Sequence, residues 1–404
     1  MSSPPRPDAE APLFSRQFIR PFGALLAVQF TLGISLSVFL LLPKILVARM
    51  GASPSYVGLV AAVFGLAGVA VIPLVGARID HARRVPMLVA AGVLMIVTPL
   101  GFLLVHDAGV LAVVLRGLQG ACWALVYSAG AALAADLSPP RRLAQMMGLW
   151  GSANLITSAL SPAFVEPLID HAGPGAAYLV AAAAGLVSVG LTRLIDEPAP
   201  ERSAAARAIP LHIVLRRPST LRMIVIVTIT GVAFGAMFTF HQPMALGLGI
   251  RNVRGFFIAY TAGALGVRLI LGPVMDRVGA YRMTALSLGT YAAVVTAMSL
   301  LAPGRLEIFG GLFGVAHGVF FPSFMALIVG STAPEERGRL LTVWNGSFLA
   351  GSIMALPLGA LAAAVGYPAV FVAAGLATFG GMAILLRWPP APYTTPHPVL
   401  GIPG

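Results

Sequence analysis

Twelve apolar runs, separated by short polar segments, make up most of this 404-residue chain and restrict its fold more than any other feature. A helix needs about 20 consecutive apolar residues to cross the hydrocarbon core of a bilayer. The runs lack strand-like alternation, and only helices and closed barrels satisfy every backbone group in lipid. We therefore predict an all-α membrane protein with twelve transmembrane helices. The runs cover residues 22–43, 56–76, 86–105, 110–135, 144–168, 175–194, 220–244, 255–275, 283–302, 306–331, 339–363 and 367–387.

The composition excludes most soluble functions. Hydrophobic residues make up 58% of the chain and charged residues only 10%, whereas a soluble domain carries about 25% charged residues. The sequence contains no phosphate-binding glycine loop, no cluster of metal-ligating side chains and no nucleophile beside a supporting base. We therefore expect no enzyme activity, no cofactor and no bound metal.

The longest polar interruption, residues 195–219, divides the runs into two sets of six. The Pro-rich segments at both ends of the chain have little apolar surface to bury, so we predict that they are disordered. The predicted organisation is a cytoplasmic tail (1–21), a six-helix bundle (22–194), a cytoplasmic linker (195–219), a second six-helix bundle (220–387) and a C-terminal cytoplasmic tail (388–404).

The net charge of +12 is distributed as in a membrane protein. With both termini in the cytoplasm, the cytoplasmic segments hold 19 of the 26 basic residues, and the outer segments hold five. This asymmetry predicts a multi-pass protein of the bacterial inner membrane with both termini cytoplasmic. The basic residues are expected to contact lipid headgroups. No basic stretch is interleaved with aromatic residues, so we expect no nucleic-acid partner.

A charged segment occurs twice, with Asp80 and Asp276 separated by 196 residues, and each copy follows an apolar run. Such a duplication is typical of secondary transporters. The second copy reads Gly-x-x-x-Asp-Arg-x-Gly, and the first departs from this pattern at His81 and Arg83. A separate Arg-x-x-Gln-Gly pattern begins at Arg116 in the fourth run.

Together these patterns resemble the motifs of the major facilitator superfamily, and in length the chain looks like its bacterial twelve-helix efflux permeases. The resemblance implies two pseudo-symmetric bundles whose first, fourth, seventh and tenth helices line a central cavity. It also implies that the two charged segments form a latch that closes the cytoplasmic side. The alternative for the arginines is simple anchoring of the topology. The latch residues would be Gly76, Asp80, Arg83, Arg84, Gly272, Asp276, Arg277 and Gly279.

Arg116 is the most informative single residue because an unpaired charge within a membrane costs at least about 2.5–3.5 kcal/mol. Glu166, near the outer end of the fifth run, is the only carboxylate within a run at comparable depth. We therefore hypothesise that Arg116 and Glu166 form a pair or share a proton. The alternative is that Arg116 extends to the outer headgroups while Glu166 is interfacial.

Other polar residues of the implied cavity helices are candidate substrate or proton sites. His317 lies in the middle of the tenth run and changes charge near neutral pH; a neutral histidine bonded to a helical carbonyl is the alternative. His241 is expected nearer the outer interface, and Gln29 and Gln119 are further candidates. Gly310, Gly314 and Gly318 form a small-residue stripe that predicts close helix packing.

The predicted function is secondary active transport by alternating access, with a small amphipathic compound exported in exchange for protons. The compound could be drug-like, sugar-like or a metabolite. A proton symporter or uniporter that imports a small organic solute is the alternative, and a non-transporting membrane receptor is a remote one. The expected partners are the small-molecule substrate, protons and membrane lipids, and the protein is expected to function as a monomer.

Overall fold

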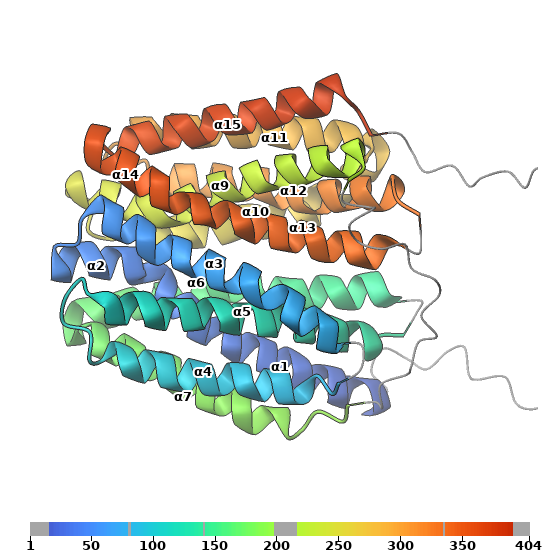
Figure 1. Ribbon diagram of the computed structural model, residues 1–404, viewed down its shortest axis with the longest axis horizontal. Helices are drawn as coiled ribbons and strands as arrows, with labels where there is room; N and C mark the ends of the chain where they lie inside the picture. Colours follow the sequence, from blue (N-terminus) through green and yellow to red (C-terminus); the bar gives the residue numbers. More distant parts are fainter. Residues whose placement is uncertain (1–15, 80–81, 140–141, 198–215, 334–335, 391–404) are drawn as a thin grey trace, which may run out of the picture.

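The computed structural model describes residues 16–79, 82–139, 142–197, 216–333 and 336–390, and every regular element in these ranges is helical (Figure 1). The first set of helices is α1 (Arg16–Val38), η1 (Phe39–Leu41), α2 (Leu42–Met50), α3 (Pro54–Ile79), α4 (Val85–Phe102), α5 (Val110–Asp136), α6 (Leu143–Ala172) and α7 (Pro174–Thr192). The second set is α9 (Pro218–Gly247), α10 (Arg254–Val278), α11 (Ala280–Ala297), η3 (Met298–Leu300), α12 (Leu306–Gly330), α13 (Arg337–Gly351), η5 (Ser352–Met354), α14 (Ala355–Val365) and α15 (Tyr367–Arg387).

The predicted all-α membrane architecture is confirmed. Ten helical segments in the described ranges are each long and apolar enough to cross a membrane. Helices α6 and α10, of 30 and 25 residues, run alongside them and complete a bundle of twelve membrane-length helices (Figure 1). The first span differs from the prediction: α1 begins at Arg16, inside the predicted tail, and the apolar segment continues through η1 and α2 to Met50.

Helix packing follows the same order in both sets. In the first set, α3 packs on α5, and α1 packs on α6 and α7. In the second set, α10 packs on α12, and α9 packs on α13 and α15. The two sets meet where α3 lies against α13 and α14 and where α6 lies against α10.

Small residues allow the helices to approach almost to backbone contact. A Cβ atom added to Gly310 or Gly314 on α12 would lie 2.5 Å or 2.0 Å from a carbonyl oxygen of α10, so the stripe packs helix against helix as predicted. Between the sets, a Cβ on Gly58 of α3 would lie 2.3 Å from the Ala355 carbonyl oxygen of α14. A side chain at either contact would therefore force the helices apart.

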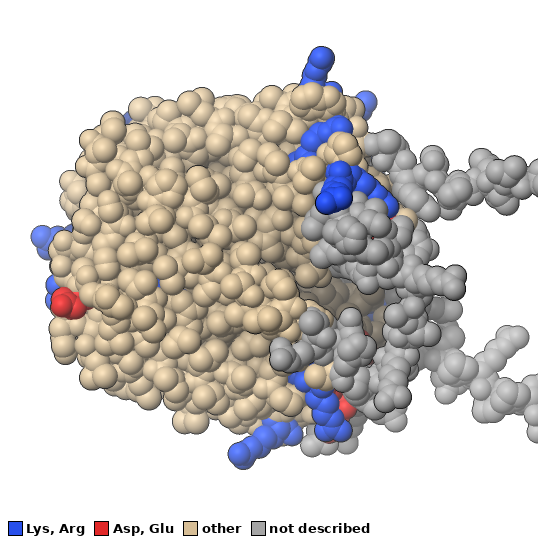
Figure 2. Space-filling view, viewed as in Figure 1, with Lys and Arg blue, Asp and Glu red and all other residues tan. Residues whose placement is uncertain are grey.

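Helix α1 begins and α15 ends at the same end of the bundle, which we call the termini end; the opposite end is the far end (Figure 1). On the face drawn in Figure 2, most charged side chains gather at the termini end, a few lie at the far end, and the middle zone is almost entirely uncharged. Many large apolar side chains of the bundle are exposed; Leu269, for example, has 82% of its surface exposed. Such a surface is stable in contact with lipid chains.

Candidate functional site

The two sets of helices are joined at the far end and separate toward the termini end. Figure 2 shows the molecule hollowed at the termini end, between second-set helices above and first-set helices below. The polar residues that face the junction lie on α2, α5, α6 and α9. The candidate site is therefore the interior of the junction, bounded at the far end by a polar closure.

Glu166 of α6 forms the centre of this closure, which we call the far-end bridge: Glu166, Lys44, Gln242 and the backbone N–H groups of Val253 and Arg254. The Lys44 Nζ atom lies 2.6 Å from Glu166 Oε1, and both side chains are almost fully buried. The N–H groups of Val253 and Arg254, where α10 begins, donate to the same carboxylate at 2.8 Å and 2.7 Å. A first-set carboxylate thus caps a second-set helix, where the helix dipole favours negative charge.

Gln242 of α9 adds two further hydrogen bonds between the sets. Its Nε2 atom donates to the Leu40 carbonyl at 2.7 Å, and its Oε1 atom accepts from the Lys44 N–H at 3.2 Å. Gln242 is fully buried. Because hydrogen bonds in a low-dielectric interior are strong and costly to leave unmade, these contacts favour a closed far end.

Arg116 of α5 lies within the junction, and uncharged neighbours on the first set contact its guanidinium. Its Nη1 atom donates to Gln119 Oε1 at 2.8 Å, and its guanidinium lies 4.3 Å from the centre of the Phe64 ring. Gln119, in turn, donates to Thr98 Oγ1 at 3.4 Å. A hydrogen bond and a cation–π contact together offset part of the cost of a charge within the membrane.

Arg116 also borders a small cavity of about 70 Å³ that both sets line. Leu40 and Val60 contribute from the first set, and Phe238 and Thr239 contribute from α9 of the second set. A cation and an apolar wall therefore face the same space, which is the arrangement expected of a site for an amphipathic molecule.

The hypothesis that Arg116 pairs with Glu166 is wrong in this conformation. The Glu166 carboxylate is occupied by Lys44 and two backbone N–H groups, and Arg116 is bonded to Gln119. The first predicted run ended at residue 43 and so left Lys44 outside the membrane, but α2 carries Lys44 back into the bundle, where it is 5% exposed. A nearer cation therefore takes the carboxylate.

His317 of α12 lies in an aromatic cluster of the second set. Its ring centre is 5.0 Å from that of Phe234 and 6.0 Å from that of Phe348. Phe234 stacks on Phe238 at 4.3 Å, so an aromatic row connects His317 to the cavity beside Arg116. The Nδ1 atom of His317 is buried and has no hydrogen-bond partner among the described residues. No helical carbonyl satisfies that atom, and the predicted proton or substrate role of His317 stays a prediction.

The other candidates from the implied cavity helices are also buried. His241 is adjacent to Gln242 of the far-end bridge and is fully buried, stacked 4.0 Å from Phe256, with Nδ1 bonded to the Met237 carbonyl at 2.5 Å. It packs within the second set, and its predicted substrate or proton role stays a prediction. Gln29 of α1 is 3% exposed, and its role stays a prediction.

Only part of the predicted latch falls within the described residues. Asp80 lies outside them, and although the backbones of Gly272 and Asp276 belong to α10, their immediate surroundings are not described. Arg83 and Arg277 are exposed, Gly76 lies on α3 with open space around it, and Gly279 adopts φ +91° directly before α11. The latch function itself stays a prediction.

Arg84 has a defined place within the first set. Its Nη1 atom lies 2.6 Å from Asp136 Oδ2 at the end of α5. The N–H groups of Arg84 and Val85 donate to the Glu197 carboxylate, which follows α7 and so caps the start of α4. These contacts join α4, α5 and the segment after α7 at the termini end. The predicted latch role of Arg84 stays a prediction.

Comparison with known proteins agrees with this architecture. The sequence profile of the Major Facilitator Superfamily matches residues 24–310 and 306–402. A curated relative, the tetracenomycin C resistance and export protein of Streptomyces glaucescens, is 26% identical over 246 residues. The matched stretch covers 59% of this chain and 40% of that relative's length.

Solved transporter structures share the fold at low sequence identity. A variant of the nucleoside transporter NupG superposes with a TM-score of 0.75 at 11% identity, covering 90% of this chain and 99% of that one. A bacterial homologue of the human lysosomal transporter Spinster, solved inward-facing and unoccupied, gives a TM-score of 0.68 at 11% identity, covering 92% and 95%. The twelve-helix bundle, the site between its two sets of helices and the profile match across the chain establish that this protein belongs to the Major Facilitator Superfamily of membrane transporters.

Proposed function

We propose that the protein exports a small amphipathic compound by alternating access, in exchange for protons, with its termini end in the cytoplasm. The observation that carries the proposal is the position of Arg116: it borders a cavity lined by both sets of helices, beneath a far end that is closed. A compound that enters from the open termini end meets this site before it meets the closure. The export direction is also that of the relative named as a resistance and export protein.

The lining of the site favours an amphipathic substrate. Arg116 offers a cation whose charge is only partly offset by Gln119 and Phe64. Phe238 lines the same cavity from the second set, and Phe234 and His317 continue the aromatic row behind it. A molecule that places a small apolar group in this cavity of about 70 Å³ and one hydrogen-bond acceptor or negative group beside Arg116 would contact both sets of helices at once.

Glu166 is the proton carrier that the geometry favours. Its carboxylate accepts a charge-assisted hydrogen bond from Lys44 and two from the start of α10, and all three weaken when the carboxylate is protonated. Arrival of a proton from the far side would therefore release the closure, and its departure would restore it. His317 has no comparable contact between the two sets of helices among the described residues.

Flux measurements in oriented vesicles test direction and coupling together. We would prepare right-side-out and inside-out vesicles and screen a compound panel that includes tetracenomycin C. The proposal predicts accumulation in inside-out vesicles with an acidic lumen, and loss of accumulation when a protonophore is added. Proton-dependent accumulation in right-side-out vesicles would instead establish a symporter. Equilibration of the compound down its own concentration gradient, without any effect of the proton gradient, would establish a uniporter.

A further inference from the structure

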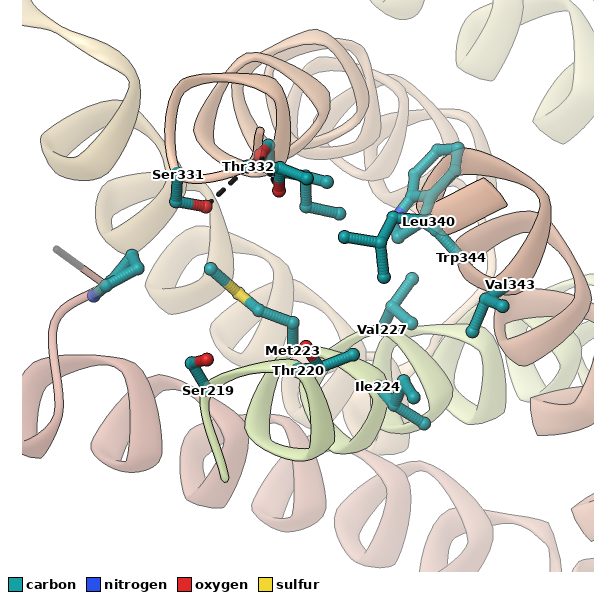
Figure 3. Close-up of a pocket in the computed structure, with 12 residues that line it drawn as sticks. Ser219, Thr220, Met223, Ile224, Val227, Ser331, Thr332, Leu340, Val343 and Trp344 are labelled. Atoms are coloured by element: carbon teal, nitrogen blue, oxygen red, sulfur yellow. Dashed lines mark hydrogen bonds between the residues drawn. The ribbon is translucent and has the colours of Figure 1, made fainter. Parts of the chain in front are cut away.

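A second cavity, of about 240 Å³, lies at the termini end and is lined by the second set of helices, by Ser331 and Thr332 directly after α12, and by Pro390 after α15. Figure 3 shows side chains of α9, α12 and α13 pointing toward one another around it. The lining residues that matter here are Thr220, Met223, Val227, Thr332, Leu340 and Trp344. Arg116 and the aromatic row beside His317 do not line this cavity, so it is separate from the candidate transport site.

Trp344 gives the cavity a specific chemical property. The residue is 2% exposed, and its indole Nε1 atom is buried with no hydrogen-bond partner among the described residues. The ring is held in place by Phe321, whose ring centre lies 4.6 Å away. In Figure 3 the indole nitrogen lies at the ring edge beside Leu340, on the cavity side. A buried donor without an acceptor is costly, and a ligand oxygen in the cavity would remove that cost.

The other polar groups around the cavity also favour an acceptor. Helix α9 begins here with no side-chain cap on Arg217, so the first-turn N–H groups of Ser219 and Thr220 have no intrahelical partner. Arg217 itself is bonded to Glu336 through two contacts of 2.7 Å and 2.9 Å, so the two charges neutralise each other. The hydroxyl of Thr332 donates to its own helix at the Ile328 carbonyl. The site thus offers donors and no free charge.

We propose that this cavity is a binding site for a small, uncharged, mostly apolar molecule of about two rings, with a carbonyl-type oxygen that accepts a hydrogen bond from Trp344 Nε1–H. The size follows from volume, because an apolar cavity of about 150 Å³ holds one benzene ring. Met223, Val227 and Leu340 supply the apolar contacts. The site is independent of the proposed export function.

A second tryptophan in the chain provides an internal control. Trp150 of α6 is also buried, and its Nε1 atom likewise has no partner among the described residues. Its ring packs directly on α5, because a Cβ atom added to Gly130 would lie 3.2 Å from the ring. Two buried indole donors therefore differ in their surroundings: one borders the 240 Å³ cavity and the other faces a helix backbone.

Indole nitrogen NMR of the full-length protein in detergent micelles tests the proposal. The chain contains four tryptophans, so ¹⁵N-indole labelling gives four resonances, which single Trp→Phe variants assign. Coumarin is the probe, since it has two fused rings and a lactone carbonyl; naphthalene is the matched probe without an acceptor. We expect coumarin to move the Trp344 Nε1–H proton downfield in a saturable titration, while Trp150 stays unchanged and naphthalene gives no downfield shift.

Two variants complete the test. Trp344→Phe keeps the aromatic packing but removes the donor, and it should weaken coumarin binding about three- to tenfold, as expected for one net hydrogen bond. Val227→Phe fills the cavity and should abolish the shift while the Trp344 resonance remains as evidence of folding. The proposal is overturned if coumarin leaves Trp344 unchanged, shifts Trp150 equally, or binds Val227→Phe as well as the wild-type protein.

Discussion

Arg116 shows how a single charge can define a site inside an apolar bundle. Its guanidinium has a hydrogen-bond partner in Gln119 and a ring beneath it in Phe64, both from the first set of helices. These contacts hold the charge at the edge of a cavity that α9 completes from the other set. These contacts offset part of the cost of a charge within the membrane, and Arg116 still borders the cavity that we propose as the substrate site.

Replacing Arg116 with alanine should reduce the initial rate of substrate flux at least about tenfold, because a charge-assisted hydrogen bond is worth about 1.5–3 kcal/mol. Arg116→Lys should recover little, since lysine lacks the planar fork that reaches Gln119 while lying over Phe64. Flux in vesicles, normalised to the amount of folded protein, is the measurement. Arg222→Ala is the matched control, because Arg222 makes a similar ring contact with Trp388, 5.5 Å away, outside the site. A wild-type rate for Arg116→Ala would contradict this role.

Lys44 and Glu166 should behave as a coupled pair. Removing one member of a buried ion pair leaves the other uncompensated, at a cost of about 3–5 kcal/mol, whereas removing both costs less. Lys44→Met should therefore lower the thermal midpoint in detergent more in the wild-type background than in Glu166→Gln. Asp170→Asn is the control, because Asp170 lies 3.3 Å from Lys44 but its side chain is 52% exposed. Additive effects of Lys44→Met and Glu166→Gln would contradict the pairing.

From the sequence, most polar residues of the site could be identified, but the residues that they contact could not. It identified Arg116, Gln119, Glu166 and His317, because polar residues are conspicuous inside apolar runs. It missed Lys44, since the first run was ended at residue 43 and α2 continues to Met50. It did not single out Gln242, although that residue lies inside the predicted run 220–244. The continuing apolar pattern after Lys44 was the available signal. The partner of Glu166 depends on how α2, α6 and α10 converge, which is a tertiary contact with no local sequence signature.

At the scale of elements, the helices were predictable and their contacts were not. Runs of about 20 apolar residues gave the helix number and approximate bounds because lipid imposes that length. The Gly310, Gly314 and Gly318 stripe also gave a packing face correctly, since the missing side chains bring α12 close to α10. The opposing partner of α3 was not evident. Gly58 and Gly359 come together from helices on different sets. Gly58 and Gly65 lie seven residues apart on α3 and both face the second set, but their spacing does not say which helix they meet.

Gly58→Val should open the contact between α3 and α14. A Cβ atom at this position would lie 2.3 Å from the Ala355 carbonyl oxygen, and backbone cannot yield as a flexible side chain can. We expect slower flux and faster maleimide labelling of a cysteine placed at Thr239, in a Cys122→Ala background, from the far side of the membrane. Gly190→Val is the control, because a Cβ there meets nothing within 4 Å. Equal labelling rates in the two variants would show that this contact does not hold the far end closed.

At the scale of the whole molecule, the proposed mechanism makes the far-end bridge and the hollow at the termini end one of two conformations between which the transporter alternates. Glu166 caps α10 across the junction, Gln242 reaches Leu40, and α3 lies against α14. A transporter that works by alternating access must reverse this arrangement, so these contacts have to break while new ones form at the termini end. The bridge is built from few groups, which makes it a suitable control point for that exchange.

The central claim is that the Glu166 charge holds the far end closed, and double electron–electron resonance tests it most directly. One spin-label pair at Asp107 and Arg251 reports the far end, and a second at Arg193 and Arg387 reports the termini end; all four side chains are exposed. In Glu166→Gln we predict that the far-end distance distribution shifts to longer values while the termini-end distribution shifts to shorter values. Unchanged distributions at both ends, with Asp170→Asn indistinguishable from Glu166→Gln, would contradict the account.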